Sequence, residues 1–361
     1  MNKQKRNYVS ALFTVPLFIL LPLPVFAQVV VNDTLTGSSS SYPWTTTGGA
    51  CLTAGTAVST LTSTIPACVG LPYYSGKTQV GGVSGRLPDP VGSGALRLTN
   101  GDTTTGTNGN SNAGSVVSKT PFQTSQGVQV NFTTTTYGGN AFGNGNGVPS
   151  GADGLVFFLK DGTKTNPTIG SVGGSLGYSC SQNNYPPAGV EGGYLAVAAD
   201  EYGNFSNRGD STATGIGPNP NTIVVRGSGD IRWSSLNAQY PVYYPSSLSP
   251  TDQDQAVRDT CRLGTIQNWS SGQTVTTTNG NNGKQVVTPV TSTDTGTKIR
   301  DYDLISLSPP LPVPIFNQEA VNMPTRGAAV PITYDLKITQ DGLLNFAYSI
   351  NGGAFQNVVT N

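Results

Sequence analysis

The sequence ITYDLKITQDGLLNFAYSI, from Ile332 to Ile350, contains the clearest structural signal in the chain. Apolar and polar residues alternate on both sides of the turn Gln340-Asp341-Gly342, and a second turn follows at Asn351-Gly352-Gly353. Alternation with a period of two around a glycine-containing turn is typical of an antiparallel hairpin with one buried face. The stretch therefore predicts a β protein, with a further strand beginning at Phe355.

Similar strand signals are spread along the chain between clusters of Gly, Ser, Thr and Asn. Glycine is frequent (46 residues) and charged residues make up only 11%, a composition that favours turns and strands over helices. We therefore expect an all-β sandwich with long loops, in which the apolar run Gly154–Leu159 is buried on both faces. The expected core residues are Leu155, Phe157, Leu176, Leu195, Val197, Val224, Leu336, Ile338, Phe346 and Tyr348.

Charge and the lack of histidine narrow the possible functions. The chain contains no histidine, which excludes histidine-ligated zinc and Ser-His-Asp or Cys-His catalysis. Its 19 Lys and Arg residues balance 19 Asp and Glu residues; without the three cations of the N-terminal segment, 16 stand against 19, a net charge of −3. This balance indicates no basic surface for nucleic acid or anionic lipid.

The first 27 residues are typical of a secretory signal peptide. Basic residues precede an apolar segment from Ala11 to Leu21, and Val25-Phe26-Ala27 forms a small-residue cleavage site. A retained membrane anchor is the alternative, although the apolar segment is short for a span. Because no second apolar run of spanning length follows, we expect residues 28–361 to form one exported domain that is secreted, periplasmic or at the cell surface, with no membrane span after signal removal.

Four cysteines are candidates for disulfide bonds: Cys51, Cys68, Cys180 and Cys261. An exported chain passes through compartments that allow oxidation, and four cysteines permit three pairings. The short separation favours the pair Cys51–Cys68, which leaves Cys180 with Cys261. Free buried thiols are the alternative.

Regular patterns weaken between about residues 229 and 327, where apolar runs are too few for a separate core. We interpret this segment as a long irregular insertion in the single domain; for Gly272–Thr297, a disordered linker is an equal alternative. Because a strand begins at Phe355 and the sequence stops at Asn361, we expect the domain to be incomplete at the C-terminus. A longer surface protein with further domains is compatible with this expectation.

Three motifs contain residue types suited to ligand binding. The first, Gly151-Ala152-Asp153-Gly154, lies directly before an apolar strand, and the second is the glycine-rich run Gly173–Tyr178. The third, Asp200–Asp210, places oxygen donors at close spacing after another strand-like run. Closely spaced carboxylate and amide oxygens suit calcium, which prefers hard oxygen ligands.

The same motifs suit a neutral carbohydrate, which needs fixed acceptors beside donors; Asp153, Gly174 and Asn204 supply a carboxylate, a backbone N–H and an amide. In order and spacing, the three motifs resemble those of the legume-type (L-type) lectins and their bacterial relatives. The resemblance implies an antiparallel two-sheet concanavalin A-like sandwich (jelly roll) and a cis peptide before Asp153. It assigns the carbohydrate contacts to Asp153, Gly173, Gly174 and Asn204.

The resemblance also implies one calcium ion (Ca2+), with ligands from Asp200, Tyr202, Asn204 and Asp210. Ala198 stands where the plant proteins have a glutamate ligand, and the chain has no histidine, so we expect no transition metal. Glu201 is expected to face solvent, because alternation along the strand directs it away from Asp200.

The leading interpretation is a protein that binds a glycan or polysaccharide without transforming it. The enzyme alternative is a glycoside hydrolase on the same sandwich, which needs two carboxylates about 5–5.5 Å apart for retention. No Glu-x-Asp-x-x-Glu run occurs, and Asp200 and Glu201 point to opposite faces of their strand. A structural or adhesin-like surface module with a decayed sugar site is the third interpretation.

Overall fold

The computed structural model describes residues 31–56, 64–69, 82–84, 86–99, 113–137, 142–143, 149–150, 153–166, 168–207, 216–241, 243–263, 265–266, 275–279, 285–289, 298–299, 304–311 and 325–360. The predicted signal peptide, Ala152, Asp210 and most of Gly272–Thr297 lie outside these residues. Within the described part, the dominant element is the antiparallel β-strand, as the composition predicts.

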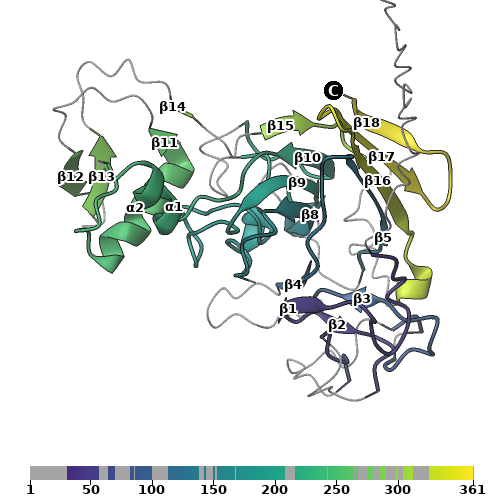
Figure 1. Ribbon diagram of the computed structural model, residues 1–361. Helices are drawn as coiled ribbons and strands as arrows, with labels where there is room; N and C mark the ends of the chain where they lie inside the picture. The colour runs from purple at the N-terminus through teal and green to yellow at the C-terminus, as the bar shows by residue number, and fades with distance from the viewer. Residues whose placement is uncertain are drawn as a thin grey trace, which may run out of the picture.

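Two sheets, each with four strands among the described residues, form the centre of the molecule (Figure 1). The first sheet, in the order β15-β10-β9-β8, contains β8 (Gly154–Lys160), β9 (Gly193–Asp200), β10 (Thr222–Arg226) and β15 (Leu304–Leu307). The second, in the order β18-β17-β16-β5, contains β5 (Val128–Thr134), β16 (Ile332–Ile338), β17 (Leu344–Ile350) and β18 (Gln356–Thr360). Neighbouring strands in both sheets are antiparallel.

The hairpin predicted between Ile332 and Ile350 is confirmed as β16 and β17. Ile332 lies opposite Ile350 and Ile338 lies opposite Leu344, while β5 pairs with the other edge of β16. On the outer face of this sheet, Gln129 Nε2 donates to Asp335 Oδ1 at 3.1 Å. The alternation in the sequence therefore corresponds to one apolar inner face and one polar outer face.

The two sheets pack face to face through a shared hydrophobic core. Phe132 of β5 and Phe157 of β8 meet there with ring centroids 5.7 Å apart, so the contact joins one sheet to the other. The buried residues of this core are Leu195, Val197, Ala199, Ile223, Val225, Leu311, Ile332, Tyr334, Leu336, Leu344, Phe346, Tyr348 and Val359, with Phe157 and Ile338 packed against them. Most of the expected core residues belong to this set, and the sandwich of two antiparallel sheets is confirmed in this coarse form.

The outer face of the first sheet is also covered, by loops that follow β8 and β9. Its buried residues are Tyr178, Val190, Ala196, Ala198, Phe205 and Val224, with Leu176 packed against them. Val224 and Leu176 were expected in the core but lie on this outer face, not between the sheets. β8 is half-buried along its length, Leu155 included, because it forms the edge of its sheet; the expectation that Gly154–Leu159 is buried on both faces is corrected accordingly.

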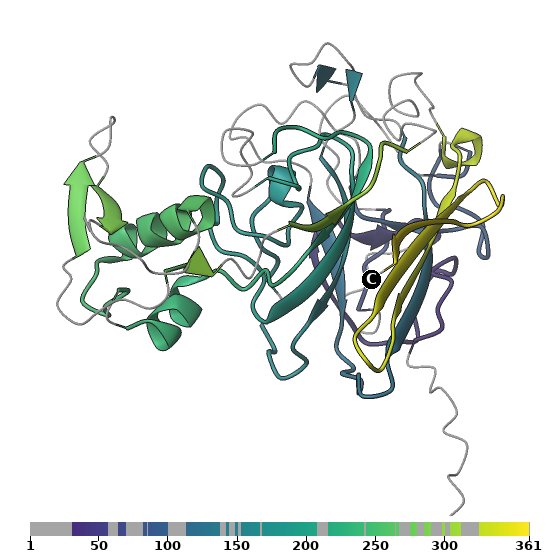
Figure 2. The ribbon, with the colours of Figure 1, turned by 90° about the horizontal axis from the view of Figure 1, so that it is seen from above.

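A helical lobe (residues 231–263) projects from one side of the sandwich in both views (Figures 1 and 2). Its helices α1 (Trp233–Gln239) and α2 (Pro250–Leu263) contact each other, and α2 also contacts β13 (Gln285–Pro289), which pairs with β12 (Val275–Asn279). The lobe has a small core of its own, made of Cys180, Ile231, Leu236, Tyr244, Ala256, Val257 and Cys261 with three partly buried aromatic residues. The segment 229–327 is thus less irregular than expected, because aromatic side chains and a disulfide replace long aliphatic runs.

Both predicted disulfides are present. Cys51–Cys68 joins residues 17 apart, and Cys180–Cys261 joins the loop after β8 to α2 across 81 residues.

The other paired strands are β1 (Trp44–Gly48) with β4 (Gly114–Ser118), β2 (Cys51–Leu52) with β3 (Leu96–Arg97), β6 (Phe142–Gly143) with β7 (Pro149–Ser150), and β11 (Thr265–Ile266) with β14 (Lys298–Ile299). Short 3-10 helices occur at η1 (Gly173–Ser175) and η3 (Arg326–Ala328). Among the described residues, no helix combines the length and apolarity needed to cross a bilayer.

Candidate functional site

Asp200 ends β9 and holds the turn that follows. Its side chain is fully buried; Oδ1 accepts a hydrogen bond from the backbone N–H of Gly203 and Oδ2 one from that of Phe205, each at 2.8 Å. Gly203 has a φ of +100°, and a Cβ there would come within 2.4 Å of the Asn219 nitrogen, so only glycine fits. The turn after β9 is therefore built around the Asp200 carboxyl group.

Asp153 lies beside this turn because β8 and β9 pair with Gly154 opposite Asp200. The carbonyl oxygen of Asp153 accepts hydrogen bonds from the backbone N–H groups of Glu201 (3.0 Å) and Tyr202 (3.2 Å). Gly154 has a φ of +146°, and a Cβ there would lie 2.3 Å from a carbonyl oxygen of β9. Glycine is thus required at position 154, and the pairing of β8 with β9 brings the first and third motifs together.

Both carboxyl groups are poorly solvated. Burial raises the pKa of Asp153 to about 6. Burial also raises the pKa of Asp200 to about 8, with a further increase from the charge of Asp153 and opposition from the backbone hydrogen bonds. Two neighbouring carboxylates in a poorly solvated place favour a shared proton or a bound cation.

Asn204 contributes a third oxygen to the same turn. Its Oδ1 is buried and has no hydrogen-bond partner among the described residues. Leaving a buried polar atom without a partner costs about 1–3 kcal/mol. Asn204 stands between Gly203 and Phe205, the two residues whose N–H groups bind Asp200. An unpartnered amide oxygen in a turn with two desolvated carboxyl groups is the kind of donor set that calcium prefers.

The residues present can be tested against a calcium site. In the described part of the chain, no three His, Cys, Asp or Glu side chains gather as a metal site. A site would therefore combine Asp200 with the Asn204 oxygen and main-chain oxygens such as that of Tyr202, while Asp210 lies outside the described residues. The Asp200 carboxyl group accepts backbone hydrogen bonds from Gly203, Phe205 and Ser206, and a carboxylate with about four lone-pair sites still has one left for a cation. The donor types at this turn, a carboxylate, an amide oxygen and main-chain carbonyl oxygens, are those that calcium takes.

Glu201 is 2% exposed, so the expectation that it faces solvent is wrong. Alternation does direct it away from Asp200, but the opposite face of β9 packs against the second sheet. Burial raises the pKa of Tyr334, and the charge of Glu201 raises it further, which places Glu201 near this core tyrosine of β16. A strand covered on both faces leaves neither side to solvent.

Arg226 of β10, which no sequence motif singles out, holds the far side of the turn. It is 2% exposed; its Nη1 donates to the carbonyl oxygens of Phe205 (2.8 Å) and Asn207 (2.9 Å). Its guanidinium carbon lies 5.2 Å from the centroid of the Phe205 ring, within the range of a cation–π contact. The available signal was an arginine ending the otherwise apolar run TIVVR (Thr222–Arg226).

The glycine-rich motif lies on the same outer face of the first sheet. It forms η1, in which Gly173 has a φ of +75° and is partly exposed, whereas Gly174 is buried. At the end of the motif, the ring of Tyr178 packs 6.4 Å, centroid to centroid, from that of Phe205. The second and third motifs are therefore neighbours on one face.

Of the predicted carbohydrate contacts, the structure brings Asp153 and Asn204 to one turn and leaves Gly173 and Gly174 on the adjacent loop. Among the described residues, no hydrogen bond joins either glycine to Asp153 or Asn204. The cis peptide implied before Asp153 involves Ala152, which lies outside the described residues. The structure therefore places Asp153 and Asn204 at one turn, and it places the glycine-rich motif on the outer face of the first sheet through Leu176 and Tyr178.

The raised carboxyl pKa values predict a pH dependence of stability in the metal-free protein. The folded chain holds the Asp200 proton up to about pH 8, whereas the unfolded chain releases it near pH 4. The contribution of this proton to stability is therefore full below about pH 4 and lost as the pH rises through about 8. With a chelator present, the Tm of wild type minus that of Asp200→Asn is expected to fall from about pH 5 to about pH 9. A difference that grows with pH would contradict the raised pKa; Asp335→Asn, on the outer face of the second sheet, is the control.

Comparisons with known proteins add no assignment. No protein-family model matches the sequence, and neither curated proteins nor solved structures include a significant match. A functional inference for this chain therefore rests on the residues around Asp153, Asp200 and Asn204.

Proposed function

We propose that the chain is an exported carbohydrate-binding protein with an L-type lectin-like domain on a concanavalin A-like sandwich (jelly roll). The order of the motifs and the two facing antiparallel sheets support this proposal. The observation that carries it is the buried, unpartnered Oδ1 of Asn204 in a turn shared with the carboxyl groups of Asp153 and Asp200. Two disulfides suit an oxidising compartment outside the cytosol.

Each residue has a distinct part in the proposed site. A calcium ion held by Asp200, Tyr202, Asn204 and Asp210 would neutralise the carboxylates and engage the Asn204 oxygen. The NH₂ group of Asn204 is then directed to a sugar hydroxyl, and a backbone N–H near Gly173 and Gly174 supplies a second donor. Asp153 is only partly buried, so it can accept hydrogen bonds from sugar hydroxyls. Such charge-assisted bonds contribute about 1.5–3 kcal/mol each when desolvated.

For a glycoside hydrolase, the candidate carboxyl pair in the described part of the chain is Asp153 and Asp200, whose pKa values are raised by burial. The burial of Asp200 argues against this role. Its side chain is 0% exposed and both oxygens accept backbone hydrogen bonds, so neither faces an open site for a glycosidic oxygen. We therefore propose binding without hydrolysis; release of reducing ends from a labelled glycan by purified protein would overturn this part.

The test of the function is a glycan array probed with and without calcium. We expect binding to a limited set of glycans that disappears when calcium is chelated and returns when it is restored. Asp153→Asn should lose glycan binding yet keep the heat of calcium binding in calorimetry, since Asp153 accepts hydrogen bonds from the sugar. Folded wild type that takes up no calcium and binds no glycan would leave a structural or adhesin-like module as the better description.

A further inference from the structure

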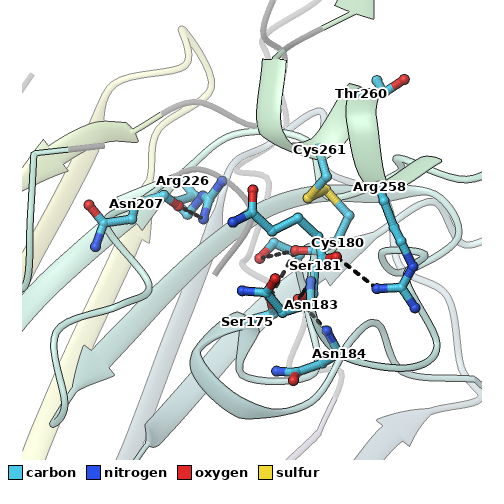
Figure 3. The surroundings of a disulfide bond; sticks show 12 residues. Ser175, Cys180, Ser181, Asn183, Asn184, Asn207, Arg226, Arg258, Thr260 and Cys261 are labelled. Atoms are coloured by element: carbon cyan, nitrogen blue, oxygen red, sulfur yellow. Dashed lines mark hydrogen bonds between the residues drawn. A yellow bond between two sulfur atoms is a disulfide. The ribbon is translucent and has the colours of Figure 1, made fainter. Parts of the chain in front are cut away.

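The loop between η1 and β9 is fastened to the helical lobe by a disulfide and by hydrogen bonds. Cys180 is linked to Cys261 of α2, and both residues are fully buried (Figure 3). Arg258, one turn earlier on α2, donates from Nη1 to the carbonyl oxygen of Gln182 at 2.9 Å. Arg232, at the start of α1, donates from Nη2 to the carbonyl oxygen of Gly189 at 2.6 Å. The loop therefore has covalent and polar attachments to the lobe.

The same loop is fastened to the glycine-rich turn. Ser175 Oγ, in η1, donates to the carbonyl oxygen of Cys180 at 2.8 Å, so the disulfide and the turn meet at one residue. Asn184 Nδ2 donates to the carbonyl oxygen of Val172, directly before η1, at 3.0 Å. Ser181 Oγ accepts hydrogen bonds from the backbone N–H groups of Asn183 and Asn184, which holds the intervening turn closed (Figure 3).

The lobe packs a buried core around the disulfide attachment. Cys180 and Cys261 are part of its buried core, together with Leu236, Tyr244, Ala256 and Val257. The hydroxyl group of Tyr244 is 2.8 Å from Oγ1 of Thr260, the residue before Cys261. The chain of contacts from the lobe core to Ser175 therefore runs through packed or hydrogen-bonded groups.

We propose that α2 is a clamp on the glycine-rich turn, with Cys180–Cys261 and Arg258 as its positioning residues. A backbone donor contributes most to binding when it is already held in place, because ordering it on binding costs free energy. The clamp reduces the opening of residues 171–184 and thereby strengthens ligand binding at this turn. The effect on binding rests on the proposed carbohydrate site, whereas the effect on the order of the turn does not.

The test compares two double variants, each lacking one disulfide and leaving no free thiol: Cys180→Ser/Cys261→Ser and, as matched control, Cys51→Ser/Cys68→Ser. In the first variant, amide hydrogen exchange in residues 171–184 should be about tenfold faster or more, while β16 and β17 keep wild-type protection. Affinity for the glycan found on the array should fall by about tenfold, with calcium affinity unchanged. In the control variant, exchange in residues 171–184 and glycan affinity should stay at wild-type values.

Two outcomes would overturn the clamp: wild-type exchange in residues 171–184 of Cys180→Ser/Cys261→Ser, or faster exchange there with unchanged glycan affinity. If wild type binds no glycan, the proposed function fails, and the exchange measurement alone decides whether the clamp exists. If the double variant does not fold, Arg258→Ala with the disulfide intact replaces it. That variant should speed exchange in residues 171–184, and Arg258→Lys, which can still donate to the Gln182 carbonyl oxygen, should restore part of the protection; equal exchange in both and in wild type would refute the clamp.

Discussion

Asp200→Ala is expected to remove calcium binding and, with it, glycan binding. The substitution deletes the charged ligand of the proposed site and also the acceptor of the Gly203 and Phe205 N–H groups, so the turn that carries Asn204 loses its support. Because calcium affinity depends on the number of charged ligands, we expect it to fall by about two orders of magnitude or more. Calorimetric titration of the folded variant with calcium measures this loss directly.

Asp200→Asn separates the two roles of this side chain. Its amide oxygen can still accept one backbone hydrogen bond, but the charge is gone, and a buried carboxyl group with a pKa of about 8 no longer has to be accommodated. We therefore expect the Tm of the chelated Asn variant to rise relative to that of wild type between about pH 5 and about pH 9, while the variant also fails to bind calcium. Asp335→Ala, in the second sheet, should keep the full heat of calcium binding. A wild-type heat of binding in Asp200→Ala would show that the metal sits elsewhere.

Alternation and spacing predicted those parts of the molecule in which one face meets the core and the other meets solvent. The β16–β17 hairpin has this arrangement, so its strands could be read directly from Ile332–Ile350. Cysteine spacing was enough for the disulfides, because the short Cys51–Cys68 separation leaves one partner for Cys180. In both cases a local property of the sequence determines the contact.

The first sheet was harder to predict because loops distant in sequence cover its outer face. Glu201 was assigned to solvent on the assumption of one exposed face, yet it is buried beside the second sheet. Leu176 and Val224 pack on the outer face, a placement that depends on where the loops around Tyr178 and Phe205 fold back. Period-two patterning cannot show which of two covered faces is the main core.

The candidate site also has features that the sequence predicts and features that it does not. The neighbourhood of Asp153 and Asp200 follows from two adjacent antiparallel strands, and the motif order anticipated it. Arg226 could not be assigned, because its partners are main-chain carbonyl groups in a loop about twenty residues earlier in the chain. Every residue has a main-chain carbonyl group, so the sequence does not indicate which carbonyl groups accept hydrogen bonds from an arginine. The only sequence signal for Arg226 is a charged residue at the end of an apolar strand. The helical lobe was missed for a related reason, since its core depends on aromatic residues and on Cys180 from outside the lobe.

Arg226→Ala is expected to produce the largest loss of stability among substitutions near the site. It removes the donor of the Phe205 and Asn207 carbonyl groups and leaves a cavity against the Phe205 ring, in a place that water does not fill freely. Unpaired buried carbonyl groups and a large-to-small change in a packed site together lower the free energy of unfolding by about 3 kcal/mol or more. Urea unfolding of the chelated proteins measures this difference without interference from calcium.

Two further variants show which property of Arg226 matters. Arg226→Met keeps much of the volume and the contact with the Phe205 ring but donates no hydrogen bond. The decrease in its free energy of unfolding, relative to wild type, therefore estimates the contribution of the two hydrogen bonds to carbonyl groups. Lys337→Ala, an exposed position on β16, should stay within about 0.5 kcal/mol of wild type. If Met at position 226 were as stable as arginine, packing would account for the whole effect. If alanine there also unfolded like wild type, Arg226 would not hold the turn, and the order of Asn204 would have to come from Asp200 alone.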